Sequence, residues 1–318
     1  MNKYLIIEKE QRIQIEKKYT YAIERIFEEL DKKGEQYSLV YYKDIELILN
    51  NPMEILVNGE SILNFTHIIF RGHSLGSPLE YETKRIIIDY IEQHNSSNKD
   101  RNVIIQNKET IKLIPYYDKI YITMLCIQNN IPIGTTYYRA NNSNLVKQEK
   151  ISYPLIAKQY AGVNDLRLID GKEKVKKNVY LLNSPDDFNQ EHLKDKDLNE
   201  YILQEFIDSG EDMRIFVSKG NVVSGFIRKA TEGFMTVNKG EYTYIDFSET
   251  KNNDIKELAQ RVAKVFKADF IAVDLMRKTT GELVLIEISL NPGFKAFETK
   301  TEGIGTETNI AKVIIESF

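Results

Sequence analysis

Two acidic residues interrupt two otherwise apolar stretches near the C-terminal end of the chain. Asp274 lies within Phe270–Met276, and Glu287 lies within Leu283–Ile288. Apolar runs of this length predict β-strands, and the Lys278–Gly281 turn between them predicts a hairpin. If the hairpin is centred between the last two residues of that turn, the two carboxylates lie directly opposite each other on one face.

Two carboxylates that face each other in a sheet need a bound proton or a nearby cation. Like charges on directly opposite residues destabilise a sheet, so the pairing predicts that one acid is protonated or that a cation lies between them. Two hard oxygen ligands at this spacing, with room for phosphate oxygens and water, suit Mg²⁺. The alternative is a register shifted by one residue, which would turn one acid toward solvent and leave no metal site.

The segment after the second strand places more polar side chains beside Glu287. It reads Ser289-Leu290-Asn291-Pro292-Gly293, a strand end followed by a Pro-Gly turn. With Asp274 before it and a last helix expected over 309–316, this order resembles the ATP-grasp superfamily, and within it the RimK-like glutamate ligases. Those proteins carry an acid in one strand, then E-x-N-x-x-P-G, then a final helix.

The resemblance continues upstream through short segments that follow the order of the family, over roughly 200 residues in all. They are Asp118-Lys119 before Asn130–Ile133, Pro154–Lys158, Tyr201–Ile207, Gly210–Arg214, and Ile227–Ala230 with Glu232, Gly233 and Asn238. Each segment alone has an ordinary explanation, such as exposed lysines or the wet face of an edge strand. Their shared order and spacing favour the ATP-grasp fold.

By this resemblance, Lys119 and Lys158 hold the phosphates of ATP, and Arg228 is the catalytic residue that stabilises charge on the reacting acyl group. The resemblance assigns the remaining nucleotide contacts to the strand that pairs with adenine and to residues near that strand. They are Gln204, Glu205, Phe206, Ile207, Asp212 and Asn238. The resemblance implies four side chains with oxygen atoms as the metal ligands: Asp274, Glu287, Ser289 and Asn291.

Two departures from the family pattern leave the number of metal ions and full activity open. The glycine-rich loop after the lysine strand keeps only Gly162 within 161–167, although Arg167 could supply charge there. Ser289 stands where the family has the metal-binding asparagine, with Asn291 two residues further on.

The implied fold is an α+β ATP-grasp fold of two α+β lobes that clamp ATP, preceded by an N-terminal α/β domain. We expect the N-terminal domain over 1–114, the small lobe over 115–200 and the C-terminal lobe over 201–318. Strands and helices alternate in the first third, which favours a parallel sheet. That third also predicts a hairpin of Ile55–Val57 with Ile62–Leu63. A helix over 118–128 is expected to turn four residues inward: Ile120, Met124, Leu125 and Ile127.

The implied activity is an ATP- and Mg²⁺-dependent carboxylate–amine ligase, with Mn²⁺ as an alternative ion. A carboxylate attacks ATP to give an acyl phosphate, and an amine then displaces phosphate to leave an amide, ADP and phosphate. The partners are ATP, a carboxylate substrate and an amine that is an amino acid, a peptide or a small metabolite. Family members commonly form dimers or tetramers, so a homo-oligomer is implied too. Two alternatives within the fold are an inositol-phosphate-type kinase and a degenerate nucleotide-binding protein.

A rival interpretation comes from Gly72-His73-Ser74-Leu75-Gly76, which follows a strand and has the G-x-S-x-G pattern of serine hydrolases. Ser74 would be the nucleophile, and the triad would need a histidine downstream. Only His94 and His192 are available, and both fall in polar surface segments. A loop at the end of the strand, lining a ligand cleft, is the better explanation.

Composition narrows the class of protein. The 318 residues are 28% charged with a net charge of −4, which provides no general basic field for nucleic acid or membranes. Cys126 is the single cysteine, so neither an internal disulfide nor a multi-cysteine metal site can form. No apolar run approaches the length of a membrane helix, and the first residues read as a strand. We therefore expect a cytoplasmic protein.

Overall fold

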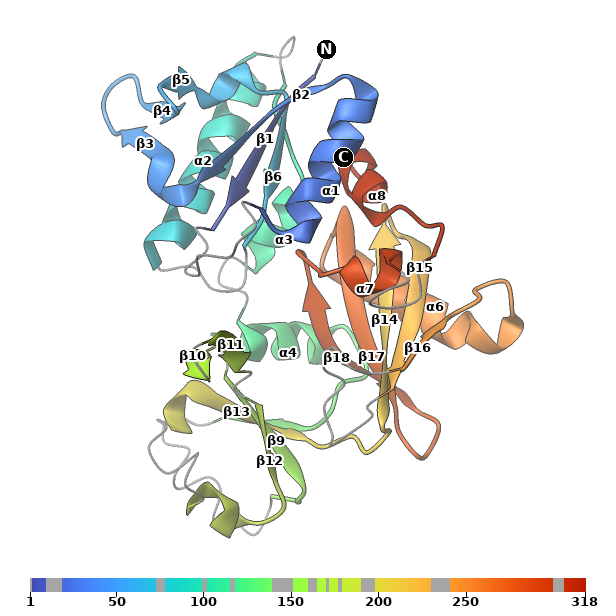
Figure 1. Ribbon diagram of the computed structural model, residues 1–318. Helices are drawn as coiled ribbons and strands as arrows, with labels where there is room; N and C mark the ends of the chain where they lie inside the picture. Colours follow the sequence, from blue (N-terminus) through green and yellow to red (C-terminus); the bar gives the residue numbers. More distant parts are fainter. Residues whose placement is uncertain are drawn as a thin grey trace.

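The computed structural model describes residues 2–9, 19–72, 78–98, 102–114, 118–138, 151–159, 165–169, 172–176, 179–189, 198–229, 241–299 and 306–318. Figure 1 shows an N-terminal domain above, a C-terminal sheet beside it and a smaller lobe below.

The N-terminal domain is built on a parallel sheet in the order β2-β1-β6-β7. Its strands are β1 (Lys3–Glu8), β2 (Gln36–Tyr41), β6 (His67–Phe70) and β7 (Ile104–Ile105). Alternate residues of β1 enter two different cores, one with α2 (Pro78–Ser97) and α3 (Lys108–Leu113), the other with α1 (Tyr21–Lys33). The sheet therefore has helices on both faces, which confirms the predicted α/β layer.

A small antiparallel sheet lies between β2 and β6 in the chain, and part of it differs from expectation. It contains β3 (Ile45–Ile48), β4 (Glu54–Val57) and β5 (Glu60–Ser61). Residues 62–64 form a 3₁₀ turn, so the predicted pairing of Ile55–Val57 with Ile62–Leu63 is wrong. The reason is the turn: Asn58 and Gly59 both have positive φ, and a two-residue turn of this kind starts the partner strand at once.

The small lobe contains a four-stranded sheet in the order β12-β9-β13-β8. Its strands are β8 (Thr136–Tyr137), β9 (Leu155–Gln159), β12 (Val179–Leu182) and β13 (Tyr201–Glu205), and a separate hairpin pairs β10 (Asp165–Ile169) with β11 (Lys172–Lys176). β13 pairs with β9, so the strand that directly follows the expected boundary at residue 200 lies in the small-lobe sheet. Residues 185–189 form a 3₁₀ turn after β12.

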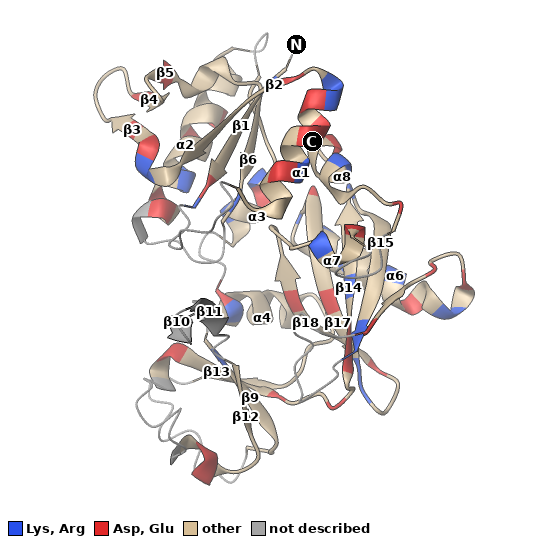
Figure 2. Cartoon of the chain, viewed as in Figure 1, with Lys and Arg blue, Asp and Glu red and all other residues tan. Residues whose placement is uncertain are grey.

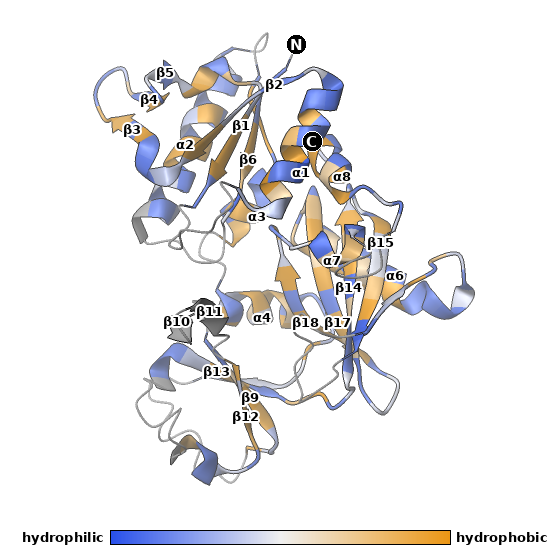
Figure 3. Ribbon diagram, viewed as in Figure 1, coloured by the Kyte–Doolittle hydropathy of each residue, from blue (hydrophilic) through white to orange (hydrophobic). Residues whose placement is uncertain are grey.

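The C-terminal lobe is a five-stranded antiparallel sheet in the order β16-β15-β14-β17-β18. The strands are β14 (Glu211–Ser218), β15 (Asn221–Lys229), β16 (Glu241–Tyr244), β17 (Phe270–Arg277) and β18 (Leu283–Ser289). One face packs on α6 (Asn253–Val265), and the other packs on α7 (Lys295–Glu298) and α8 (Ile310–Glu316). Figure 3 shows the apolar colouring concentrated on these central strands.

Helix α4 (Lys119–Gln128) lies at the start of the segment that resembles the ATP-grasp family, but its buried face is not the expected one. The buried residues are Ile122, Thr123 and Cys126, whereas Met124 is 38% and Ile127 63% exposed. The helix is apolar around most of its circumference, so periodicity alone could not select the face. Packing against α6 selected it. Among the described residues, no helix has both the length and the apolar character that a membrane crossing requires.

An aromatic cluster joins three strands of the C-terminal sheet to α7, and it generates a stability prediction. Phe216 is fully buried and its ring contacts those of Phe226, Phe270 and Phe297. Phe216→Ala should lower the free energy of unfolding by roughly 3–5 kcal/mol, because it leaves a cavity in a packed core. Denaturant unfolding measures this, with Tyr244→Ala at a 46% exposed position as the control. Equal losses in both variants would contradict the packing described.

Candidate active site

Asp274 and Glu287 are direct cross-strand partners, as the sequence predicted. Close to the turn, however, Leu275 pairs with Leu285, a register that would continue with Asp274 opposite Ile286. A β-bulge between residues 274 and 275 shifts the register by one and brings Glu287 into place instead. Figure 2 shows the acidic segments of β17 and β18 side by side. The pairing is thus confirmed, but its origin is a bulge and not the centre of the turn.

The carboxylate of Asp274 is buried and held by two arginines. Arg214 donates from Nε to Oδ1 at 2.8 Å and from Nη2 to Oδ2 at 2.6 Å, and Arg228 donates from Nη2 to Oδ2 at 3.2 Å. Arg228 also donates from Nε to Asp212, its cross-strand partner. Four charged side chains therefore form one network across β14, β15 and β17.

This network sets the ionisation of Asp274. Burial raises the pKa of its carboxyl, but Arg214 and Arg228 lower it further, and the net pKa lies below the ordinary value. The same pairing acts on Arg214, whose pKa is raised by Asp274 in spite of its burial. The sequence predicted that one of the facing acids is protonated or that a cation lies between them. The described residues supply that charge as guanidinium groups bound to Asp274.

Lys158 projects from β9 of the small lobe into the same region. Its Nζ donates to Oε1 of Gln204 at 2.9 Å, and Gln204 donates from Nε2 to the hydroxyl of Thr136 at 3.0 Å. Burial lowers the pKa of Lys158 to about 8, partly offset by the negative charge of Glu287. Keeping this amine charged in a desolvated position costs free energy unless an anion lies close to it.

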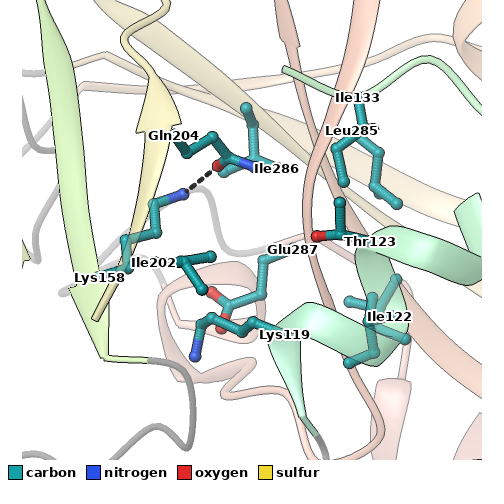
Figure 4. Close-up of a pocket in the computed structure, with 11 residues that line it drawn as sticks. Lys119, Ile122, Thr123, Ile133, Lys158, Ile202, Gln204, Leu285, Ile286 and Glu287 are labelled. Atoms are coloured by element: carbon teal, nitrogen blue, oxygen red, sulfur yellow. Dashed lines mark hydrogen bonds between the residues drawn. The ribbon is translucent and has the colours of Figure 1, made fainter. Parts of the chain in front are cut away.

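A pocket lies where the small lobe, α4 and β18 meet, and four of the predicted residues line it: Lys119, Lys158, Gln204 and Glu287. Figure 4 shows Lys158 and Gln204 on one side and Lys119 and Glu287 on the other. The apolar lining comes from α4, β13, β18 and the segment before β8: Ile122, Ile133, Ile202, Leu285, Ile286 and Ile288. In a regular strand only alternate residues face one side, so the bulge explains why consecutive residues of β18 border the pocket.

The predicted adenine-binding residues lie at the junction of the two lobes. Glu205 accepts from the backbone N–H of Thr135 at 3.0 Å and pairs with Nζ of Lys278 at 2.8 Å. Its pKa is lowered, because Lys278 and that N–H outweigh the effect of burial. The backbone N–H of Phe206 donates to the carbonyl of Pro154 at 3.2 Å, and Ile207 is buried. Lys278 belongs to the β17–β18 turn, so this pair joins the two lobes.

The other predicted residues have different positions. Ser289 follows Glu287 by two residues on β18 and therefore shares its face, whereas Asn291 lies beyond the strand. Asn238 and Ser74 lie outside the described residues. The roles proposed for all these residues stay predictions.

Two residues of the site were not predicted from the sequence, although the sequence contained an indication of one of them. Arg214 follows Asp212 by two residues, which places both on one face of β14, and it pairs directly with Asp274 on β17. Lys278 had no comparable signal, because its partner Glu205 comes from the other lobe.

The donor set fits a magnesium ion that also takes oxygens from a nucleotide. Glu287 is exposed, and within the described part of the chain it makes no hydrogen bond or ion pair. Asp274 keeps further lone pairs beyond those that the arginines use. No group of three or more His, Cys, Asp or Glu side chains that could hold a metal occurs among the described residues. Mg²⁺ is suited to such a site, since it is usually bound by one or two carboxylates plus phosphates and water.

Comparison with known proteins identifies the family. The family model described as the RimK-like ATP-grasp domain matches residues 117–318, which is more than half of the chain. The chain therefore belongs to the RimK-like ATP-grasp family, and the resemblance seen in its motifs is confirmed.

Curated relatives match part of the chain. Beta-citrylglutamate synthase B of Danio rerio is 26% identical over 184 residues, covering 54% of this chain and 40% of that protein. Probable alpha-L-glutamate ligase 2 of Hahella chejuensis is 32% identical over 119 residues, covering 37% of each. The chain thus spans less than half of the length of these relatives.

A solved structure matches nearly the whole chain. The Chryseobacterium gregarium RiPP-associated ATP-grasp ligase, in complex with ADP and a leader and core peptide, has a TM-score of 0.62 and 16% identity. The match covers 99% of this chain and 96% of that one. It establishes the ATP-grasp fold, including the N-terminal region that precedes residue 117.

The lowered pKa of Lys158 generates a prediction about pH. If Lys158 binds phosphate as a cation, affinity for a Mg²⁺–ATP analogue should fall as the pH rises through about 8, because the free protein loses that proton there. Calorimetric titration at pH 7, 8 and 9 measures the fall. Lys158→Arg should flatten the profile, and Lys112→Gln at an exposed lysine should leave it unchanged. A flat wild-type profile would contradict the assignment.

Proposed function

We propose that the protein is an ATP- and Mg²⁺-dependent carboxylate–amine ligase. A substrate carboxylate attacks the γ-phosphate of ATP and forms an acyl phosphate with release of ADP. An amine then attacks the acyl carbon, phosphate leaves, and an amide bond forms. One observation carries this proposal: Lys119 and Lys158 border one pocket with Glu287, directly opposite Asp274 on the next strand.

The residues of the pocket suit the charges of this reaction. ATP brings several negative charges, which must be offset before a second anion can approach the γ-phosphate. Lys158 and Lys119 are the cations available from β9 and α4. Glu287 and Asp274 would hold the Mg²⁺, with Ser289 and Asn291 as further oxygen donors. When bound, the ion would neutralise charge on the transferring phosphoryl group.

Arg228 would stabilise the reacting acyl group. Its guanidinium is fixed by Asp212 and Asp274, and a donor held in advance needs no rearrangement during the reaction. Glu205, Phe206 and Ile207 lie at the lobe junction, where a purine could pair with the backbone. Gln204 would fix the position of Lys158 through their hydrogen bond.

The relatives suggest the class of substrate. The curated relatives are named as glutamate ligases or synthases of glutamate conjugates, and the structure similar over nearly the whole chain contains a leader and core peptide. We propose an amino acid or a peptide as the amine or carboxylate partner. The observations favour no kinase, and the family membership removes the support for a serine hydrolase at Ser74.

The two acids should respond differently to substitution. Glu287→Gln should abolish Mg²⁺-dependent ADP release and leave thermal stability unchanged, because this side chain is exposed. Asp274→Asn should abolish turnover and also lower the free energy of unfolding by about 3 kcal/mol, because it removes the buried carboxylate that pairs with two partly buried arginines. Glu257→Gln, on the exposed side of α6, is the control for both measurements. Retained turnover in Glu287→Gln would refute the metal assignment.

Nucleotide binding itself is tested by thermal unfolding with Mg²⁺ plus ADP, with Mg²⁺ plus a non-hydrolysable ATP analogue, and with neither. A ligand at about 100 times its Kd should add roughly 2.7 kcal/mol of stability. Lys158→Ala should remove that gain. A wild-type protein that shows no gain at millimolar nucleotide would refute the proposed function.

A further inference from the structure

A cavity of about 620 Å³ lies on the C-terminal lobe, apart from the candidate active site. It is lined by α6, by the residues that follow this helix and by the turn between β14 and β15. α6 packs on the face of the sheet that carries Leu275, whereas Ala272 packs with α7 and α8 on the opposite face, which Asp274 shares. The proposed nucleotide site therefore leaves this cavity unused, although its volume is within the range of ligand clefts.

Cations outnumber acids among the described residues that line the cavity. Arg261, Lys264 and Lys267 follow one another at intervals of three residues along α6 and just beyond it, and all three are exposed. Glu257 is the acid in this set. In the described part of the chain, the side chains of Lys264 and Lys267 make no hydrogen bond or ion pair. The whole chain has a net charge of −4, so the cluster is opposite in sign to the protein that carries it.

Two lysines at the cavity have an unusual backbone conformation. Lys219, in the β14–β15 turn, has a φ of 48°, and Lys267 has a φ of 51°. The other described non-glycine residues with positive φ are asparagines: Asn58, Asn107 and Asn130. Asparagine and glycine adopt this left-handed conformation more readily than lysine, and glycine is the usual residue just beyond the end of a helix. A lysine at both positions is therefore better explained by its charge than by the backbone.

Hydrogen bonds fix the walls of the cavity. Nε2 of Gln260 donates to the carbonyl of Gly220 at 3.0 Å, which ties the β14–β15 turn to α6. The backbone N–H of Lys219 donates to the carbonyl of Asp269 at 2.8 Å, which ties the same turn to the start of β17. The carboxylate of Asp269 accepts from the backbone N–H of Asn107 at 2.5 Å and so is directed toward the N-terminal domain. The cavity is thus formed before any ligand binds.

The lining favours a peptide over other polyanions. None of the described lining residues is aromatic, so they offer no ring on which the bases of a single-stranded nucleic acid could stack. They also include no large apolar side chain that could enter a membrane. Arg261 and Lys267 are roughly 9 Å apart along the helix direction, and alternate side chains of an extended peptide are roughly 7 Å apart. Acids at alternate positions of such a peptide could therefore pair with more than one of the cations.

We propose that this cavity binds an acidic peptide segment of a partner protein through Arg261, Lys264 and Lys267. The carboxylates of the segment would give the two unpaired lysines their counter-charges, and the charges of the two surfaces would be complementary. The inference goes beyond the proposed ligase function, since the cavity and the pocket between the lobes share no lining residue. The protein could therefore hold this partner and its nucleotide at the same time.

The experiment is fluorescence anisotropy of end-labelled peptides with the full chain. One peptide alternates aspartate and glutamate, and its uncharged counterpart alternates asparagine and glutamine. The wild type should bind the acidic peptide more tightly by roughly tenfold or more, because only that peptide complements the cations. The double variant Lys264→Gln with Lys267→Asn should weaken this binding roughly fivefold or more. Its thermal midpoint should not fall, because asparagine suits a positive φ at position 267.

The matched control is the double variant Lys112→Gln with Lys251→Gln, which removes two exposed lysines elsewhere and gives the same net charge. It should keep the wild-type affinity for the acidic peptide, and both double variants should keep wild-type ADP release. An equal loss of peptide affinity in the control, or no preference of the wild type for the acidic peptide, would overturn the site. Tighter binding of single-stranded DNA, or of phosphatidylcholine vesicles that contain phosphatidylserine, would overturn the choice of a peptide.

Discussion

The carboxylate of Asp274 is the charge on which the arrangement of the C-terminal lobe depends. It lies in an otherwise apolar strand, where an ionised acid is tolerated only with cations close to it. Arg214 on β14, next to β17, and Arg228 on β15, one strand further away, provide these cations and thereby link β14, β15 and β17. The opposite position on β18 is then occupied by Glu287, whose carboxylate is left facing the pocket.

The two lobes contribute opposite charges to the pocket. The C-terminal sheet brings Glu287, and β9 of the small lobe brings Lys158. Lys158 donates its printed hydrogen bond to the neutral Gln204, and the acids Glu287 and Asp274 offset only part of the cost of keeping its amine charged. The pair of Glu205 with Lys278 and the bridge between Ile133 and Leu285 hold the lobes together around this pocket.

Sequence patterns predicted the parts of the site that lie on single strands or hairpins. Asp274 and Glu287 were predicted because each interrupts an apolar run, and Lys158 was assigned from the resemblance of Pro154–Lys158 to a strand of the ATP-grasp family. The sequence could not predict the bulge, because both possible registers of β18 bury a similar set of apolar residues. The buried face of α4 was missed for a related reason: Met124 and Ile127 are as apolar as the residues that pack inward. Lys278 was missed because its partner comes from a distant part of the chain.

The bulge in the β17–β18 hairpin has a consequence for the tolerance of this segment to insertions and deletions. In a continuous ladder, a change of one residue in the turn would move every later side chain to the opposite face. Here one residue, Ile286, already stands outside the ladder between the turn and Glu287. Loss of that residue would restore a regular ladder with the acid still opposite Asp274. This hairpin can therefore be shortened by one residue without displacing the acid from the pocket.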